Sequence, residues 1–131
     1  MSDLRSMLRF GIVSSVDASK CTARLTFPDR DNLVSAELPI LQAAGAKNKF
    51  YCLPDVGDEC VCLCPNNDDS NGGFIIGSFY HDKCAPPTTN PEVSAIKFSD
   101  GTTISYDRAT HELRIDCVGT IRINGRQVMI N

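Results

Sequence analysis

A chain of 131 residues is long enough for one compact domain, or for one small domain with an appendage. Its formal net charge of −3 lacks the basic excess of nucleic-acid-binding proteins, so nonspecific DNA or RNA binding is disfavoured. No stretch approaches the ~20 apolar residues of a membrane-spanning helix, and charges near the N-terminus interrupt any signal-peptide core. We therefore expect a chain made in the cytosol, whose seven cysteines are free thiols.

The first part of the chain has the pattern of short β-strands. After a polar lead-in at residues 1–8, apolar and polar residues alternate, and two later runs are apolar on both faces, as in strands covered on both sides. A weakly helical or irregular connection at residues 43–51 separates the third strand from the fourth. This order is that of an oligonucleotide/oligosaccharide-binding (OB) barrel over residues 9–80, and an open meander is the alternative. The five expected strands cover residues 10–17, 21–27, 33–41, 59–64 and 73–80.

Residues 81–93 contain three of the seven prolines, a composition that predicts a stiff, extended linker. Beyond it, residues 94–131 alternate with period two between turns that contain Asp-Gly, Val-Gly and Asn-Gly. A segment shorter than about 40 residues seldom folds without disulfides, metals or a partner. The five strands expected in this tail cover residues 95–98, 103–107, 111–117, 120–124 and 126–130.

The tail has an apolar face that its own strands cannot cover. Five short strands in sequence form one sheet, and one sheet cannot fold over onto itself. An exposed apolar sheet is an interaction surface or an aggregation hazard, so we expect the tail to associate with copies of itself. The side chains expected on this face are Ile96, Phe98, Ile104, Tyr106, Leu113, Ile115, Cys117, Ile121, Ile123, Val128 and Ile130.

Several segments together resemble one known family. FGIVSSVD, LTFPDRD, ELPIL, LPDVGDECVCLCP, GGFIIGSFY and FSDGTTISYDRATHELRI resemble the baseplate assembly protein V family, the central spike of contractile phage tails and related injection machines. The resemblance runs from about residue 9 to the end of the chain. Its most specific parts are the Pro-Asp-Val-Gly-Asp turn, the Gly-Gly-Phe-Ile-Ile-Gly strand and the Phe-Ser-Asp-Gly-Thr hairpin. Each of these alone is a weak signal, because Gly and Asp are common at turns in all proteins, and the specificity lies in their occurrence in this order.

The resemblance implies an all-β, homotrimeric spike that punctures the bacterial outer membrane. Its OB-like barrel would sit in the baseplate of the virion tail, against a hub protein, after assembly in the host cytoplasm. Residues 94–131 of three chains would form an intertwined β-helix or prism. The trimer interface would then consist of Ile96, Phe98, Ile104, Tyr106, Leu113, Ile115, Ile121, Ile123, Val128 and Ile130.

Two features of longer relatives are not carried over. Their tips hold iron through a His-x-His pair from each chain, whereas this sequence has two histidines, His81 and His111, and neither is near residue 131. We expect no metal at the tip, and a separate capping protein on the blunt end. A wall-degrading lysozyme domain, present in some large relatives, has no room in 131 residues.

The remaining candidates for chemistry favour a chain without catalytic function or cofactor. Cys60, Cys62 and Cys64 lie in a row on one strand, where same-face neighbours are roughly 6.5–7 Å apart, so core packing is favoured over a shared metal ion. Adding Cys52, Cys84 or His81 to that row leaves a metal site open. His111 is expected at a solvated turn, and the acidic run at 66–71 lacks the ligand spacing of a calcium loop. No catalytic motif is recognisable in the sequence.

The alternative function is a monomeric OB-fold module that binds single-stranded nucleic acid or oligosaccharide. Such a face needs aromatic platforms among basic residues. The aromatic residues available are Phe10, Phe27, Phe74 and Phe79, with few Lys or Arg beside them and no Trp in the chain. Core packing explains these rings more simply, so this function is the less favoured one.

Overall fold

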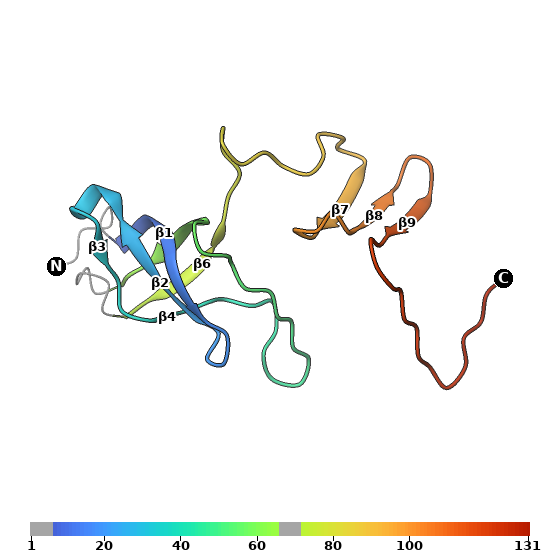
Figure 1. The fold of residues 1–131 in the computed structure, drawn as a ribbon, viewed down its shortest axis with the longest axis horizontal. Helices are drawn as coiled ribbons and strands as arrows, with labels where there is room; N and C mark the ends of the chain where they lie inside the picture. Colours follow the sequence, from blue (N-terminus) through green and yellow to red (C-terminus); the bar gives the residue numbers. More distant parts are fainter. Residues whose placement is uncertain (1–6, 66–71) are drawn as a thin grey trace. The chain divides into compact units, whose positions relative to one another are not determined.

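The computed structural model describes residues 7–65 and 72–131 of an all-β protein. The chain forms two compact units, Met1–Phe79 and Tyr80–Asn131 (Figure 1). The first unit contains a short 3-10 turn, η1 (Pro28–Arg30), and six strands. These strands are β1 (Leu8–Asp17), β2 (Thr22–Phe27), β3 (Leu33–Val34), β4 (Leu38–Pro39), β5 (Glu59–Leu63) and β6 (Phe74–Ser78).

The strands of the first unit form one antiparallel sheet in the order β3-β2-β1-β5-β6, with β4 also paired to β2. All five expected strands are present, and the third is divided into β3 and β4. The strands do not close into a barrel through a continuous ladder. In the described part of the chain, the segment after β4 meets β6 through one parallel bridge, Ile40 to Ile75, beside which the Leu41 amide donates to the Ile75 carbonyl at 3.1 Å.

The core of the first unit lies on one side of this sheet. Alternation along β1, β2 and β5 sends every second side chain inward, which is the period that a strand requires. Gly11 lets β1 approach β2 closely, because a Cβ there would lie 2.9 Å from the Leu25 Cβ and 3.1 Å from the Phe27 ring. The buried hydrophobic residues are Val13, Ala23, Leu25, Phe27, Leu38, Cys60, Cys62, Cys64 and Ile75.

One expectation for the first unit is wrong. Strands β5 and β6 are not covered on both faces: Cys62 and Ile75 are buried, whereas Leu63 and Phe74 on the opposite face are exposed. The unit has no second layer among its described residues to cover that side. For residues 43–51, where an irregular or a helical connection was expected, the irregular alternative is confirmed: the segment is a loop with a Gly45–Lys49 bridge. The segment has no apolar stripe to bury, and a short isolated helix is marginal in water.

The second unit contains a three-stranded antiparallel sheet, in the order β7 (Val93–Lys97), β8 (Thr103–Asp107) and β9 (Glu112–Asp116). The turn before β8 is fixed by Asp100, whose carboxylate accepts a hydrogen bond from the Thr102 amide at 2.9 Å. The turn after β8 is fixed in the same way by Asp107 and the Ala109 amide, also at 2.9 Å. Three of the five strands expected in the tail are therefore confirmed.

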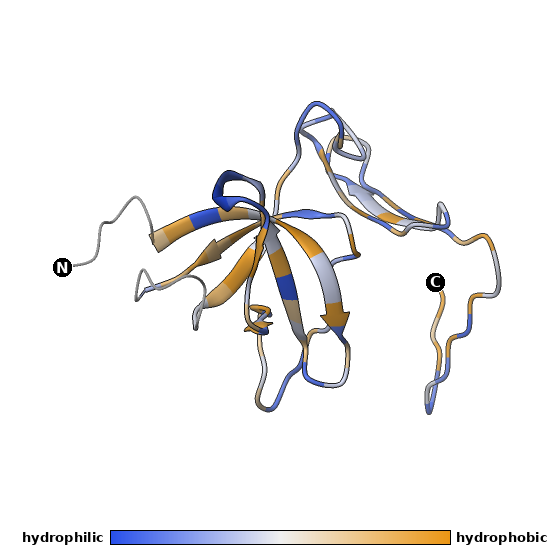
Figure 2. Ribbon diagram, turned by 60° about the vertical axis from the view of Figure 1, so that its left-hand side comes forward, coloured by the Kyte–Doolittle hydropathy of each residue, from blue (hydrophilic) through white to orange (hydrophobic). Residues whose placement is uncertain are grey.

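The other two expected strands, residues 120–124 and 126–130, are not formed. Residues 117–131 belong to no strand, although hydrophobic and hydrophilic residues follow one another along this extended segment (Figure 2). The Asn-Gly hairpin expected around residue 125 is therefore wrong for the single chain. The physical reason is that an isolated two-stranded hairpin is marginally stable at best in water and needs a further surface to pack against.

Candidate self-association surface

The register of the second unit gathers its large apolar side chains on one face. Ile96 lies opposite Ile104, and Ile104 lies opposite Ile115, so the three form a row across β7, β8 and β9. Tyr106 and Leu113 form the next row, two residues further along the strands. Because side chains on a strand alternate, both rows point to the same side of the sheet. We call the face defined by these five residues and Phe98 the spike face.

The spike face is solvent-accessible in the single chain. Its six residues are exposed to 58% for Ile96, 47% for Phe98, 37% for Ile104, 42% for Tyr106, 66% for Leu113 and 49% for Ile115. These fractions correspond to roughly 500–600 Å² of contiguous apolar surface, at the upper end of the largest patch found on ordinary monomers. A surface of that size in so small a unit indicates an interaction site.

The opposite face of the same sheet is polar. Ser105 lies opposite Ala95 and Arg114, and Thr103 lies opposite Lys97 and Asp116. The Arg114 Nε atom is 2.7 Å from Asp116 Oδ2, an exposed ion pair of the kind that contributes little to stability. The sheet is therefore amphipathic, and its orientation in any assembly is determined by which face must leave water.

The other predicted interface residues lie in the segment without strands. Ile121, Ile123, Val128 and Ile130 are all exposed. The segment is attached to the sheet at its start, where the Val118 amide donates to Thr102 Oγ1 at 3.3 Å. The Cys117 thiol lies in a local turn and accepts from the Gly119 amide at 3.4 Å. These side chains are thus available for contacts, but the single chain does not order them into a face.

The cysteine row of β5 differs from the expected geometry. The Sγ atoms of Cys62 and Cys64 are 3.9 Å apart, closer than the 6.5–7 Å expected for same-face neighbours. Cys64 directly follows β5, and its amide donates to the Met7 carbonyl at 2.6 Å. The spacing of roughly 6.5–7 Å applies to the backbone, and the two side chains lean toward each other. Burial, together with the neighbouring Cys64, raises the pKa of Cys62 to about 12. The thiol is therefore protonated at neutral pH.

The wider candidate metal ligands do not assemble around that pair. Within residues 7–65 and 72–131, no group of three or more His, Cys, Asp or Glu side chains is arranged to hold an ion. His111 is exposed at a turn, as expected, with a positive φ of 62°. The acidic run at 66–71 lies outside the described residues. All seven cysteines are free thiols.

Sequence reasoning missed two features of the first unit. Arg9 is buried at the start of β1, with its guanidinium 5.8 Å from the centroid of the Phe27 ring, a cation–π geometry. The second feature concerns the aromatic residues. Phe27 belongs to the core, but Phe10 and Phe74 are exposed, so core packing is the wrong interpretation for those two rings. Period-two alternation along β1 places Arg9 inward and Phe10 outward, so the sequence pattern could have predicted both the buried arginine and the exposed ring.

Comparison with known proteins does not assign the chain to a family. The chain matches no protein-family model, and a search of curated proteins finds no match. Within its described residues, no helix is long and apolar enough to cross a membrane. The class that the fold defines is an all-β protein of two units with antiparallel sheets, each of which exposes apolar side chains on one side.

Proposed function

We propose that this chain is the subunit of a homotrimeric spike, a membrane-puncturing device of a contractile phage tail or a related injection system. The observation that carries the proposal is the spike face, an apolar sheet face that the described residues of its own unit leave open to solvent. Three copies arranged about one axis would remove all three faces from water at once. The number three, rather than two, comes from the resemblance to the spike family and not from the surface itself.

The segment after β9 supports an intertwined arrangement. Residues 117–131 form no ladder in the single chain and carry Ile121, Ile123, Val128 and Ile130. Backbone amides and carbonyls that leave water must be paired, so these residues would form strands against neighbouring copies. Such shared hydrogen bonds and a dry interior would give the stiffness that a puncturing device needs, with the driving force supplied by sheath contraction.

The finer architecture of the first unit is part of the same proposal. An OB-like barrel is supported by its strand order and by the parallel bridge between Ile40 and Ile75, which joins the third expected strand to the fifth. In this proposal the barrel meets a baseplate hub protein, and a capping protein covers the C-terminal end. The spike acts on the bacterial outer membrane from the virion tail baseplate, without catalysis, cofactor or nucleic acid.

The absolute mass in solution tests the proposal. Light scattering on a sizing column compares the full chain with a truncation ending at Pro91, which removes β7, β8 and β9. We expect three copies for the full chain and one for the truncation. A full-length monomer would reject the spike, and a trimer that persists in the truncation would show that the spike face is not the site of assembly.

A further inference from the structure

The sheet of the first unit carries a second apolar surface, on the side that faces away from its core. Leu8 lies opposite Leu63, and Leu63 lies opposite Phe74, which gives one row across β1, β5 and β6. Phe10 is two residues further along β1 and packs edge-on against Phe79, with ring centroids 5.7 Å apart and planes at 81°. We call Leu8, Phe10, Leu63, Phe74 and Phe79 the outer patch.

The outer patch is smaller than the apolar part of a free-standing interface. Phe10 is 59% exposed, and Leu8, Phe74 and Leu63 are 46%, 45% and 37% exposed. Together these four side chains expose roughly 400 Å². A stable complex buries about 800 Å² per partner, of which roughly 60% is apolar. The patch would therefore hold a separate partner weakly, but it suffices for a partner that is already held nearby.

Among the described residues that flank the patch on β1 and β5, Glu59 is the charged side chain. At the outward positions of β1 and β5 that flank it, Ser14 and Ile12 are uncharged, and Glu59 lies opposite Ile12. The approach of an identical chain is therefore opposed by no cluster of like charges on this part of the described surface. Such a surface does not repel a second copy of the chain that is held nearby.

We propose that the outer patch packs against the first unit of a neighbouring copy of this chain. The inference rests on the proposed trimer, because assembly of the second units would tether three first units at an effective concentration on the order of millimolar. In a three-fold ring the contact is heterologous, so the patch meets a different surface of its neighbour. Val34 on β3, at the other end of the strand order, is half-exposed and lies opposite Thr26 on the outer side of the sheet, where it supplies apolar surface for the contact.

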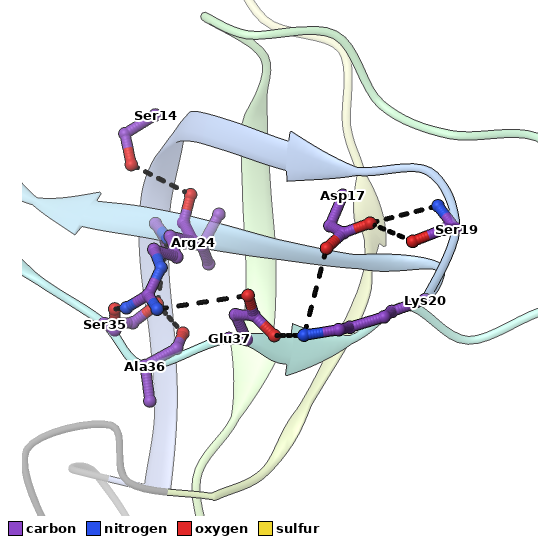
Figure 3. Close-up of polar contacts among 9 residues, drawn as sticks. Ser14, Asp17, Ser19, Lys20, Arg24, Ser35, Ala36 and Glu37 are labelled. Carbon is purple, nitrogen blue, oxygen red and sulfur yellow. Dashed lines mark hydrogen bonds and ion pairs between the residues drawn. The ribbon is translucent and has the colours of Figure 1, made fainter.

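A polar region of the same unit provides the control position (Figure 3). Lys20 Nζ lies 3.4 Å from Glu37 Oε2, and Arg24 is within 4.0 Å of the same carboxylate. Asp17 accepts hydrogen bonds from the side chain and amide of Ser19, which hold the pKa of its carboxyl below its usual value. The Lys20 side chain is 62% exposed, close to the exposure of Phe10, but it is surrounded by charge.

Site-specific photocross-linking of the full chain tests the contact. The photoreactive residue p-benzoylphenylalanine replaces Phe10 in one variant and Lys20 in the other, and chains labelled with heavy nitrogen are refolded together with unlabelled chains. We expect the variant at position 10 to give a species of twice the 14.3 kDa chain mass that joins labelled to unlabelled chains. Its cross-linked peptide should lie within residues 7–79, and the variant at position 20 should give no such species.

Other results would overturn the contact. Cross-links confined to one chain, cross-links to residues 80–131, or no cross-link from position 10 in a chain whose mass is that of a trimer would each reject it and leave the spike intact. A monomeric mass would reject the spike and, with it, the tether on which the contact depends. If circular dichroism shows that the variant at position 10 does not fold, the same measurement is made with the probe at Leu8.

Discussion

Replacing Ile104 with Asp tests whether the spike face is the trimer interface. Ile104 is the centre of the row that Ile96 and Ile115 complete, and 37% of its surface is still exposed in the single chain. Burying the remaining 60–70 Å² or so would contribute about 1.5 kcal/mol per copy, or roughly 5 kcal/mol per trimer. Three carboxylates forced together in an apolar interior would cost several kcal/mol more, or would take up protons.

A total of about 10 kcal/mol corresponds to a change of roughly 10⁷-fold in the association constant, enough to leave monomers at micromolar concentration. The assay is the mass from light scattering, with urea unfolding of the first unit as a check, since its core is separate from the changed strand. The matched control is Ser105→Asp, the next residue on the same strand, whose side chain lies on the polar face opposite Arg114. A trimer that survives Ile104→Asp, or one that Ser105→Asp dissociates equally, would refute the proposed packing.

Four further outcomes are expected. Ile121→Asp should also prevent trimer formation, and a trimer that survives this change would refute a packing in which Ile121 faces the axis. Gly11→Ala should destabilise the first unit by about 1–3 kcal/mol in urea unfolding, because its Cβ would contact Leu25 and Phe27 too closely. The pKa of Cys62 is raised from 9.0 to about 12, so its contribution to stability should be complete below about pH 9 and lost as the pH rises toward 12. The free energy of unfolding of the wild type and of Cys62→Ala, compared at about pH 8 and about pH 11, measures this loss. Titration with single-stranded DNA at low salt should show no binding, and a saturable signal would favour the OB-fold binding module.

Much of the strand content follows from the sequence. Alternation with period two located the first three expected strands of the first unit and β7, β8 and β9, because a strand sends successive side chains to opposite faces. The runs of β5 and β6 were located as short apolar segments between turns. The same rule placed Ile104 and Ile115 on one face, since a turn of fixed geometry leaves few possible registers. These are local properties, and they require no knowledge of what the faces contact.

Tertiary structure decided which faces are covered. The runs of β5 and β6 are apolar on both sides, and only the sheet order determines that Cys62 and Ile75 are buried while Leu63 and Phe74 are not. The 3.9 Å separation of the Cys62 and Cys64 Sγ atoms likewise depends on how the two side chains are oriented in the core, which the backbone spacing of a strand does not determine.

The end of the chain shows the limit of sequence reasoning most clearly. Residues 117–131 alternate as a hairpin would, yet they form no strand in the single chain. Alternation determines which side chains could share a face, but a strand persists only when its backbone groups and its apolar face find partners. The sequence by itself therefore determined the pattern of β-structure in this protein, and the tertiary structure decided where that pattern has a partner within the chain.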